Sequence, residues 1–438
     1  MSHNAAYALS ESQLSSPPRN ASKVSESEKM PFKADHARVD IWHNMLWSKY
    51  KGEVFSSLYK INDKNEFDIR FFQIAETSSD RVGLSAVNLD HHRYPFDLLF
   101  KSSYDKVGFL TRLRAILART ISSDAELTIL TGYETPESWT QLLILLLRRR
   151  KVAVFCDSTI YDRKQRLMQG LFKRIFFQTM DGIFAYGSRS KEYVIHYGAA
   201  AGIVYDRCQA AALPLDYAAE KALAMRLSVA PSTDAPRYLY VGRLSSEKGL
   251  DILLDAFARV WAQNKRATLA LVGCGFLREK LERRAATLGV DSAVHFTGSK
   301  SGDELFKEYA RATVLVLPSI SEPWGLVVNE AMSYGCPVIV SLRCGCVPEL
   351  LIESVTGFVH DPRDAKELAS KMLAAPVQFG DIEKTARDCI RLMSYYTPDK
   401  AAERLLGGIR NIISKGNRPV LLGEEEETDL HKNAGQHS

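Results

Sequence analysis

Two loops in the second half of the chain carry charged side chains whose spacing suits a phosphorylated ligand. The first is residues 242–249 (GRLSSEKG), which follow the apolar run 238–241. Its cations, Arg243 and Lys248, lie five positions apart. An arginine offers a planar fork of donors and a lysine a compact point charge, and a diphosphate accepts from both. Taken alone, this segment is equally compatible with a solvated surface loop.

The second loop, residues 318–325 (PSISEPWG), supplies carboxylates and leads into the helical pattern 326–332. Glu322 lies in the loop and Glu330 about one turn into the helix, so both can face one ligand. Carboxylates accept hydrogen bonds from vicinal hydroxyls, as in a ribose or a hexose. Free amides at 325–327 would attract phosphate at the helix start. Glu330 by itself could also be a capping carboxylate, or one that the helix dipole stabilises.

Both loops belong to a repeated pattern of strand and helix. The predicted strands are residues 238–241, 269–272, 294–296, 314–317, 338–340 and 358–359. The predicted helices are residues 248–263, 276–288, 302–312, 325–334 and 364–374. Such alternation indicates βαβ units and a parallel sheet covered on both faces. Residues 237–380 are therefore predicted to be a Rossmann-like domain.

Residues 38–216 repeat the pattern less regularly. The predicted strands are 39–42, 69–75, 127–130, 152–155 and 183–185, and the predicted helices are 52–62, 138–150, 163–179 and 190–197. Residues 76–110 have no clean period and are expected to be loops near a ligand cleft. We therefore predict an α/β fold of two Rossmann-like domains with parallel sheets that face a central cleft, where ligands bind beyond the strand ends.

Composition limits the other possibilities. The 438 residues allow two or three domains, 46% are hydrophobic and 25% charged, and no apolar run is long enough for a membrane span. The net charge of +5 is too small to indicate a nucleic-acid partner. Seven scattered cysteines favour a reducing compartment, and the N-terminal residues lack the apolar core of a secretory leader. We expect a cytoplasmic protein.

Three segments are expected to lie outside the two domains. Residues 217–236 end in a Pro/Ser/Thr/Asp cluster that is typical of a linker. Residues 1–37 and 415–438 hold few large apolar side chains and are predicted to be disordered tails.

The ordered motifs resemble a known family. Arg243 and Lys248, followed by Glu322 and Glu330, resemble the donor-site signature of retaining nucleotide-sugar glycosyltransferases of the GT-B fold, glycosyltransferase family four in particular. The flanking segments VGRLSSEKGLDILLDAF, VGCGFLREKL, VHFTG, LPSISEPWGLVVNEAMSYGCPVIVS and TGFVHDP come in the family's order. The resemblance is strong over 237–372, weaker over 38–216 and absent from the tails. The complete ordered set is highly specific, whereas two glutamates alone would be weak.

The resemblance implies a role for each matching residue. Arg243 and Lys248 would hold the donor diphosphate and stabilise the leaving nucleotide, and Glu322 would contact the transferred sugar near its reacting carbon. Glu330 would hydrogen-bond the ribose hydroxyls. The further donor-binding residues would be Gly242; Gly325, Leu326 and Val327 behind the phosphates, with Trp324 beside them; Gly273, Gly275, Thr297 and Gly298 near the base; and Gly52 from the first domain.

The resemblance also implies the reaction. Breaking the glycosidic bond develops negative charge on the leaving phosphate, which preorganised cations and amides stabilise. In the front-face mechanism of the family, a leaving phosphate oxygen takes the acceptor's proton, so no metal and no cofactor is implied beyond the donor, expected to be a UDP-sugar. The N-terminal domain would select a glycan or a lipid-linked sugar, in polysaccharide or cell-envelope glycan synthesis. Residues 381–414, two helices, would pack back on that domain.

The acceptor side departs from the family's pattern. Many relatives carry a histidine at the end of an N-terminal-domain strand, but 154–159 (VFCDST) contains none. Asp157 or Ser158 would line the acceptor site instead, or Asp157 caps a helix that starts near Asp162. His92, in the irregular stretch, is the third acceptor candidate, with a solvated loop as the alternative.

Two other functions are compatible with parts of the sequence. A catalytically inactive GT-B scaffold or sugar-binding subunit is the main alternative, although both glutamates and both cations are present. An oxidoreductase is the second alternative, because the 273–275 segment (GCG) resembles part of a dinucleotide-binding site. Arg278, however, stands where that motif needs its third glycine.

The segments 148–151 and 163–177 mix cations with large apolar side chains. They predict either a basic, partly apolar patch for peripheral contact with the cytoplasmic membrane face, or a core helix with a charged outer face.

Overall fold

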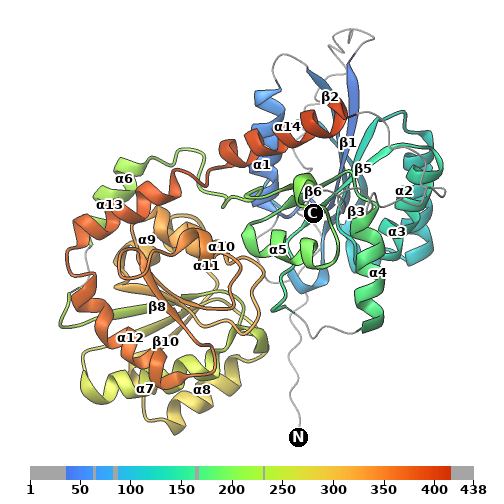
Figure 1. The fold of residues 1–438 in the computed structure, drawn as a ribbon. Coiled ribbons are helices and arrows are strands. Elements are labelled where there is room, and N and C mark those ends of the chain that lie inside the picture. The colour runs from blue at the N-terminus through green and yellow to red at the C-terminus, as the bar shows by residue number, and fades with distance from the viewer. Residues whose placement is uncertain (1–35, 63–65, 82–86, 163–166, 230–231, 416–438) are drawn as a thin grey trace, which may run out of the picture. The chain divides into compact units, whose positions relative to one another are not determined.

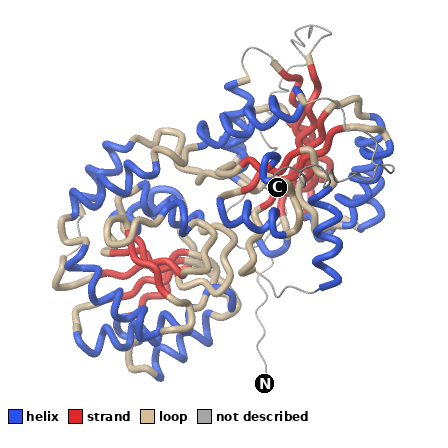
Figure 2. Tube along the Cα trace, viewed as in Figure 1, coloured by secondary structure: helices blue, strands red, loops and turns tan. Residues whose placement is uncertain are grey.

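The computed structural model describes residues 36–62, 66–81, 87–162, 167–229 and 232–415, and those from Ala37 onward belong to one compact unit. Nearly all of both predicted tails, and residues 163–166 of a predicted helix, lie outside the described residues. Helices cover both faces of each of two parallel sheets (Figure 1, Figure 2).

The N-terminal sheet has seven parallel strands in the order β3-β2-β1-β4-β5-β6-β7. The strands are β1 Ala37–Met45, β2 Phe67–Thr77, β3 Phe96–Ser103, β4 Leu127–Leu130, β5 Lys151–Cys156, β6 Gly182–Ala185 and β7 Val204–Tyr205. Its helices are α1 Lys49–Ile61, α2 Phe109–Ser122, α3 Pro136–Leu147, α4 Leu167–Gln178 and α5 Ser188–His196. The strand order reverses between β1 and β4, so this half is a Rossmann-like domain, as predicted.

The C-terminal sheet has six parallel strands in the order β10-β9-β8-β11-β12-β13. The strands are β8 Arg237–Val241, β9 Thr268–Val272, β10 Val294–Gly298, β11 Val314–Leu317, β12 Val338–Ser341 and β13 Gly357–His360. Its helices are α7 Leu250–Gln263, α8 Arg278–Thr287, α9 Gly302–Arg311, α10 Leu326–Ser333, α11 Val347–Leu350 and α12 Ala365–Gln378. The central strands are apolar along their length because both of their faces are buried. Figure 1 shows α7, α8 and α12 on one face and α9 and α10 on the other.

The expectation of loops in residues 76–110 holds only in part, among the residues of this stretch that the structure describes. The segment contains β3 and ends in the first turn of α2. β3 is an edge strand whose side chains are mostly half-buried or exposed, so it lacks the continuous apolar run that marks the central strands.

The predicted linker 217–236 holds a helix over half of its length. This helix, α6 Ala219–Ser228, contacts α9 and α13 (Ile382–Met393). Its Ala222 and Leu223 are buried, which a plain linker would not achieve. The Pro/Ser/Thr/Asp cluster that suggested a linker follows the end of α6 in the sequence.

The two C-terminal helices, α13 and α14, pack on different domains. α13 contacts α10 and α6, and its Cys389 and Met393 belong to the C-terminal core. Only α14 (Pro398–Ser414) contacts α1, burying Leu405, Ile409 and Ile412 in the N-terminal core. The prediction that both helices pack back therefore holds for α14 alone, because each apolar face matches a different core.

Candidate functional site

The two charged loops meet where the strand order of the C-terminal sheet reverses. β8 and β11 are neighbours, and ligands of open parallel sheets bind beyond the strand ends at this point. The carbonyl oxygen of Glu247, in the first loop, accepts from the amides of Ile320 (2.8 Å) and Ser321 (3.3 Å) in the second. Two segments more than 70 positions apart thus form one surface.

Two glycines, one in the first loop and one in the 273–275 segment after β9, allow close backbone contact around this surface. Gly249 has φ +66°, and a Cβ there would lie 2.3 Å from the carbonyl oxygen of Pro318. Gly273 has φ +142°, and its Cβ would lie 1.9 Å from the carbonyl oxygen of Gly242. Any side chain at either position would push the backbones apart. The predicted residues Gly242, Gly273 and Gly275 are thus brought together by direct backbone packing; contact with a base stays a prediction.

Lys248 and Glu322 form the central charged pair of this surface. The Nζ atom of Lys248 lies 2.5 Å from Oε2 of Glu322, and the side chains are 13% and 14% exposed. The hydroxyl of Ser319 lies 3.4 Å from the same carboxylate oxygen. The cation predicted for a diphosphate and the carboxylate predicted for a sugar are therefore immediate neighbours, each neutralising the other.

Arg243 belongs to the same surface through a residue that the sequence analysis did not single out. Its Nη2 lies 3.2 Å from Oε1 of Glu247, which also accepts from the hydroxyl of Ser245 at 2.6 Å. The hydroxyl of Tyr240, beneath the loop, donates to the carbonyl oxygen of Arg243 at 2.7 Å. Glu247 stands between the two cations in the sequence, and this position was the available signal.

Glu330 has different partners. Its Oε2 accepts from the hydroxyl of Tyr309 on α9 at 2.7 Å. Burial raises the pKa of Glu330 to about 7, although Tyr309 and the ammonium of Lys49 act in the opposite direction. Lys49 is the first residue of α1, so the N-terminal domain contributes charge to this carboxylate. Neither Tyr309 nor Lys49 stands near a recognisable motif.

The start of α10 is held rigidly in place. The Trp324 ring is buried, and its Nε1 donates to Oδ1 of Asn329 at 2.9 Å. The carbonyl oxygens of Glu322 and Trp324 accept from the amides of Gly345 (2.9 Å) and Cys346 (3.1 Å). Trp324 is therefore a supporting residue in this structure, while Gly325, Leu326 and Val327 form the helix start that was predicted to back the phosphates.

The remaining donor candidates lie at two places. Thr297 and Gly298 end β10, and the carbonyl oxygen of Gly298 accepts from the amide of Gly273 at 2.8 Å, so they border the loops above. Gly52 is buried in α1, and Cε1 of His92 would lie 2.7 Å from a Cβ there.

The acceptor candidates are not gathered in one place. Ser158 accepts from the hydroxyl of Tyr133 at 2.9 Å beyond the end of β5, and Asp157 is exposed beside it. His92 is buried against Gly52 and bonds to Tyr94 instead; burial lowers its pKa to about 4, so the ring is neutral. The turn after β5 is capped by Asp162, whose Oδ2 accepts from the amide of Thr159 at 2.6 Å.

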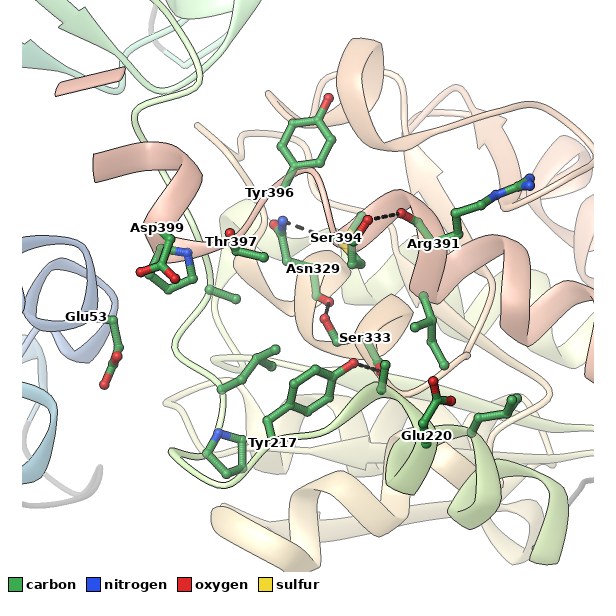
Figure 3. Close-up of a pocket in the computed structure, with 18 of the residues that line it drawn as sticks. Glu53, Tyr217, Glu220, Asn329, Ser333, Arg391, Ser394, Tyr396, Thr397 and Asp399 are labelled. Carbon is green, nitrogen blue, oxygen red and sulfur yellow. Dashed lines mark hydrogen bonds between the residues drawn. The ribbon is translucent and has the colours of Figure 1, made fainter. Parts of the chain in front are cut away.

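A cavity of about 1380 Å³ lies elsewhere, next to the residues that connect α13 to α14. Figure 3 shows Tyr217 reaching toward Ser333, where its hydroxyl donates to the carbonyl oxygen at 2.7 Å. The lining contains none of the residues predicted for donor or acceptor. Despite its volume, this cavity is therefore not the candidate site.

Comparison with known proteins bears on the same half of the chain. Residues 225–375 match the family described as "Glycosyl transferases group 1". An uncharacterized glycosyltransferase of Methanocaldococcus jannaschii is 36% identical over 34% of this chain and 38% of its own length. The sulfoquinovosyl transferase of Arabidopsis thaliana is 37% identical over 32% of this chain and 26% of its own length. The similarity thus spans well under half of these relatives.

Solved structures extend the likeness to both domains. HepE of Anabaena, solved with UDP and glucose, has a TM-score of 0.62 at 16% identity and covers 86% of this chain and 100% of its own. WaaG, a glycosyltransferase involved in lipopolysaccharide biosynthesis, has a TM-score of 0.58 at 16% identity and covers 84% and 100%. The chain therefore has the two-domain GT-B fold, and its residues 225–375 match the model of the "Glycosyl transferases group 1" family.

Proposed function

We propose that this protein is a retaining glycosyltransferase of family four that transfers a sugar from a UDP-sugar to a hydroxyl of a glycan or a lipid-linked sugar. The observation that carries the proposal is the 2.5 Å pair of Lys248 and Glu322 on two loops joined at the strand-order reversal. A nucleotide sugar places its diphosphate next to its transferred ring, so it needs a cation and a carboxylate at such short range. HepE, solved with UDP-glucose, supports the choice of donor.

The charges suit departure of a nucleoside diphosphate. As the bond between the sugar carbon and the phosphate oxygen breaks, negative charge develops on the phosphate, and Lys248 and Arg243 stabilise it. Glu322, released from Lys248 by the arriving phosphate, accepts from the sugar's hydroxyls. The acceptor oxygen bonds to the sugar carbon on the same face, and its proton passes to the leaving phosphate oxygen. Bonds and protons balance in these steps without a metal ion or an enzyme nucleophile.

The direct test is nucleotide release from a panel of UDP-, GDP- and ADP-sugars, combined with the melting temperature in each. We expect one UDP-sugar to raise the melting temperature and to be hydrolysed slowly without acceptor, because a ligand of the folded state stabilises it. Activity should persist in EDTA, and NMR should show a product with the donor's anomeric configuration. No binding and no release with any donor would favour an inactive scaffold.

We also propose that the protein works in the cytoplasm, in polysaccharide or cell-envelope glycan synthesis, and that α4 makes peripheral contact with an anionic membrane. Four apolar side chains at helical spacing are exposed along α4: Met168, Leu171, Phe172 and Ile175. The expected charged outer face is therefore wrong for this stripe. Arg174 of α4 is exposed as well, and so are Arg148 and Arg149, which follow α3. Cations beside an apolar stripe are typical of helices that lie in a membrane interface. Within the described ranges, we find no helix with the length and apolarity of a membrane span.

Liposome sedimentation tests the membrane contact. The double variant Leu171→Ser/Ile175→Ser should pellet several-fold less with phosphatidylglycerol vesicles than the wild type, and wild-type pelleting should fall as salt rises. Val377→Ser is the matched control, because Val377 is an exposed apolar residue on α12 of the other domain. Equal pelleting with neutral and anionic vesicles would contradict the proposal.

A further inference from the structure

Three consecutive residues at the start of α5 join the N-terminal domain to the loops of the candidate site. They are Gly187, Ser188 and Arg189, which follow β6 and begin the helix. α5 also contacts α11 of the C-terminal domain. Each of the three residues has a partner in that domain, so the contact is defined at several points.

Arg189 holds the turn that follows β12. Its Nη1 donates to the carbonyl oxygen of Leu342 at 2.6 Å and to that of Cys344 at 2.8 Å. The side chain is half-buried, and hydrogen bonds from a charged donor are roughly twice as strong as neutral ones. A cation of the N-terminal domain therefore fixes the backbone of a turn in the C-terminal domain.

The same turn supports the second charged loop. Cys344 pairs with Glu322 in an isolated parallel bridge, and the amide of Gly345 donates to the carbonyl oxygen of Glu322 at 2.9 Å. A Cβ on Gly345 would lie 1.7 Å from the carbonyl oxygen of Pro323, so the two backbones are in direct contact. Any displacement of the turn would therefore displace Glu322, the residue that pairs with Lys248.

Gly187 and Ser188 make the other contacts. A Cβ on Gly187 would lie 2.5 Å from Cζ3 of Trp324 and 2.6 Å from Oε1 of Glu349. The φ of Gly187 is −161°, which any residue adopts, so glycine is needed here for space alone. The amide of Ser188 donates to Oε1 of Glu349, at a helix N-terminus whose dipole favours a carboxylate. The start of α5 is thus seated against the loop that leads into α10.

We infer that Arg189 is a positioning residue for the proposed transfer reaction: it orders the 342–346 turn and, through this turn, holds Glu322 in place for the donor sugar. It acts through the backbone of the turn and not on the substrate. The effect on turnover rests on the proposed function, whereas the ordering of the turn rests on the contacts alone. Misplacement of a reacting group by about 1 Å can cost ~10²-fold in rate, so this support has a catalytic consequence.

The ordering is tested by hydrogen–deuterium exchange without added nucleotide. We expect Arg189→Ala to speed exchange of the 342–346 amides about tenfold, because two hydrogen bonds from a charged donor no longer resist local opening. Lys191→Ala is the matched control. Lys191 is a cation of the same helix, but its Nζ pairs with Asp206 of the N-terminal domain at 3.3 Å, so exchange in the turn should stay at the wild-type rate.

The catalytic consequence is tested by UDP release at saturating donor. Arg189→Ala should lower the rate about 10–100-fold, and Lys191→Ala should not lower it. Arg189→Lys should recover most of the rate, because both hydrogen bonds come from one nitrogen and an ammonium carries three donors. Arg189→Met keeps the length of the side chain and removes only its donors, so it replaces Arg189→Ala in both measurements if that variant does not fold.

The two measurements separate the possible failures. If no donor yields UDP even with the wild type, the proposed function fails, while exchange still decides whether Arg189 orders the turn. Unchanged exchange in Arg189→Ala would overturn the inference even if UDP release falls, because Arg189 would then act on the substrate directly. Faster exchange with wild-type UDP release would overturn it too, since the turn would not position Glu322. Equal losses in Arg189→Ala and Lys191→Ala would also contradict it, as general damage to α5.

Discussion

Replacing Lys248 with alanine should lower kcat for sugar transfer by about 10²–10³, the usual loss when one preorganised charge-stabilising donor is removed. The ammonium lies 2.5 Å from Glu322 and would pass to the diphosphate when the donor binds. The loss should fall mainly on kcat, because negative charge on the phosphate grows as the bond breaks. Steady-state kinetics with the preferred donor measure it.

Two variants keep this prediction falsifiable. Lys280→Ala removes a lysine of the same domain whose exposed ion pair with Asp251 spans 3.2 Å, and it should leave kcat unchanged. In Lys248→Ala/Glu322→Gln, the carboxylate left without its partner is also neutralised. If Lys248 served only to neutralise Glu322, the double variant would be no less active than Glu322→Gln alone; we expect the double variant to be further impaired. Wild-type kcat in Lys248→Ala would contradict the role directly.

Donor affinity should depend on pH through Glu330. Since the pKa of this buried carboxyl is about 7, its ionised fraction falls about tenfold between pH 8 and pH 6. A carboxylate that accepts from ribose hydroxyls loses that capacity on protonation, so the Kd for UDP-glucose should rise about tenfold over this range. Calorimetry measures it, and UDP-glucose itself does not titrate between these pH values.

Three variants test the dependence of donor affinity on Glu330. Glu330→Gln should weaken binding at pH 8 by about 10–100-fold and remove the pH dependence, because hydrogen bonds to charged groups contribute ~1.5–3 kcal/mol. Lys49→Ala should move the midpoint to higher pH, since the Lys49 ammonium lowers the pKa of Glu330. Glu279→Gln, at an exposed position on α8, should do neither. A Kd that stays constant with pH in the wild type would contradict the assignment.

The stability of the ligand-free protein should respond to pH with the opposite sign. The pKa of Glu330 rises from 4.5 to about 7 on folding, so the folded state binds this proton more tightly. The resulting stabilisation is complete below about pH 4.5 and is lost as pH rises through 7. Glu330→Gln should therefore gain melting temperature relative to the wild type at pH 8 and show a smaller gain at pH 6.

The C-terminal sheet and its two loops could be predicted because their signals are local. The central strands β8, β9, β11 and β12 are mainly apolar runs, since they are buried on both faces, and each loop follows its strand directly. Arg243, Lys248, Glu322 and Glu330 could therefore be assigned to one end of one sheet. The edge strand β3 was missed for the same reason, because a half-exposed strand has no such run.

The order of the residues along the chain accounts for which side chains belong to the candidate site, but not for the contacts they make. Lys248 meets Glu322 only because β8 and β11 are neighbours, and Lys49 influences Glu330 from the other domain. The exposed stripe on α4, and the packing of α14 but not α13 on the N-terminal core, depend in the same way on which apolar faces find a partner. Residue patterns record the character of each segment, whereas burial, pairing and shifted pKa values arise from neighbours that are distant in the chain and come together only on folding.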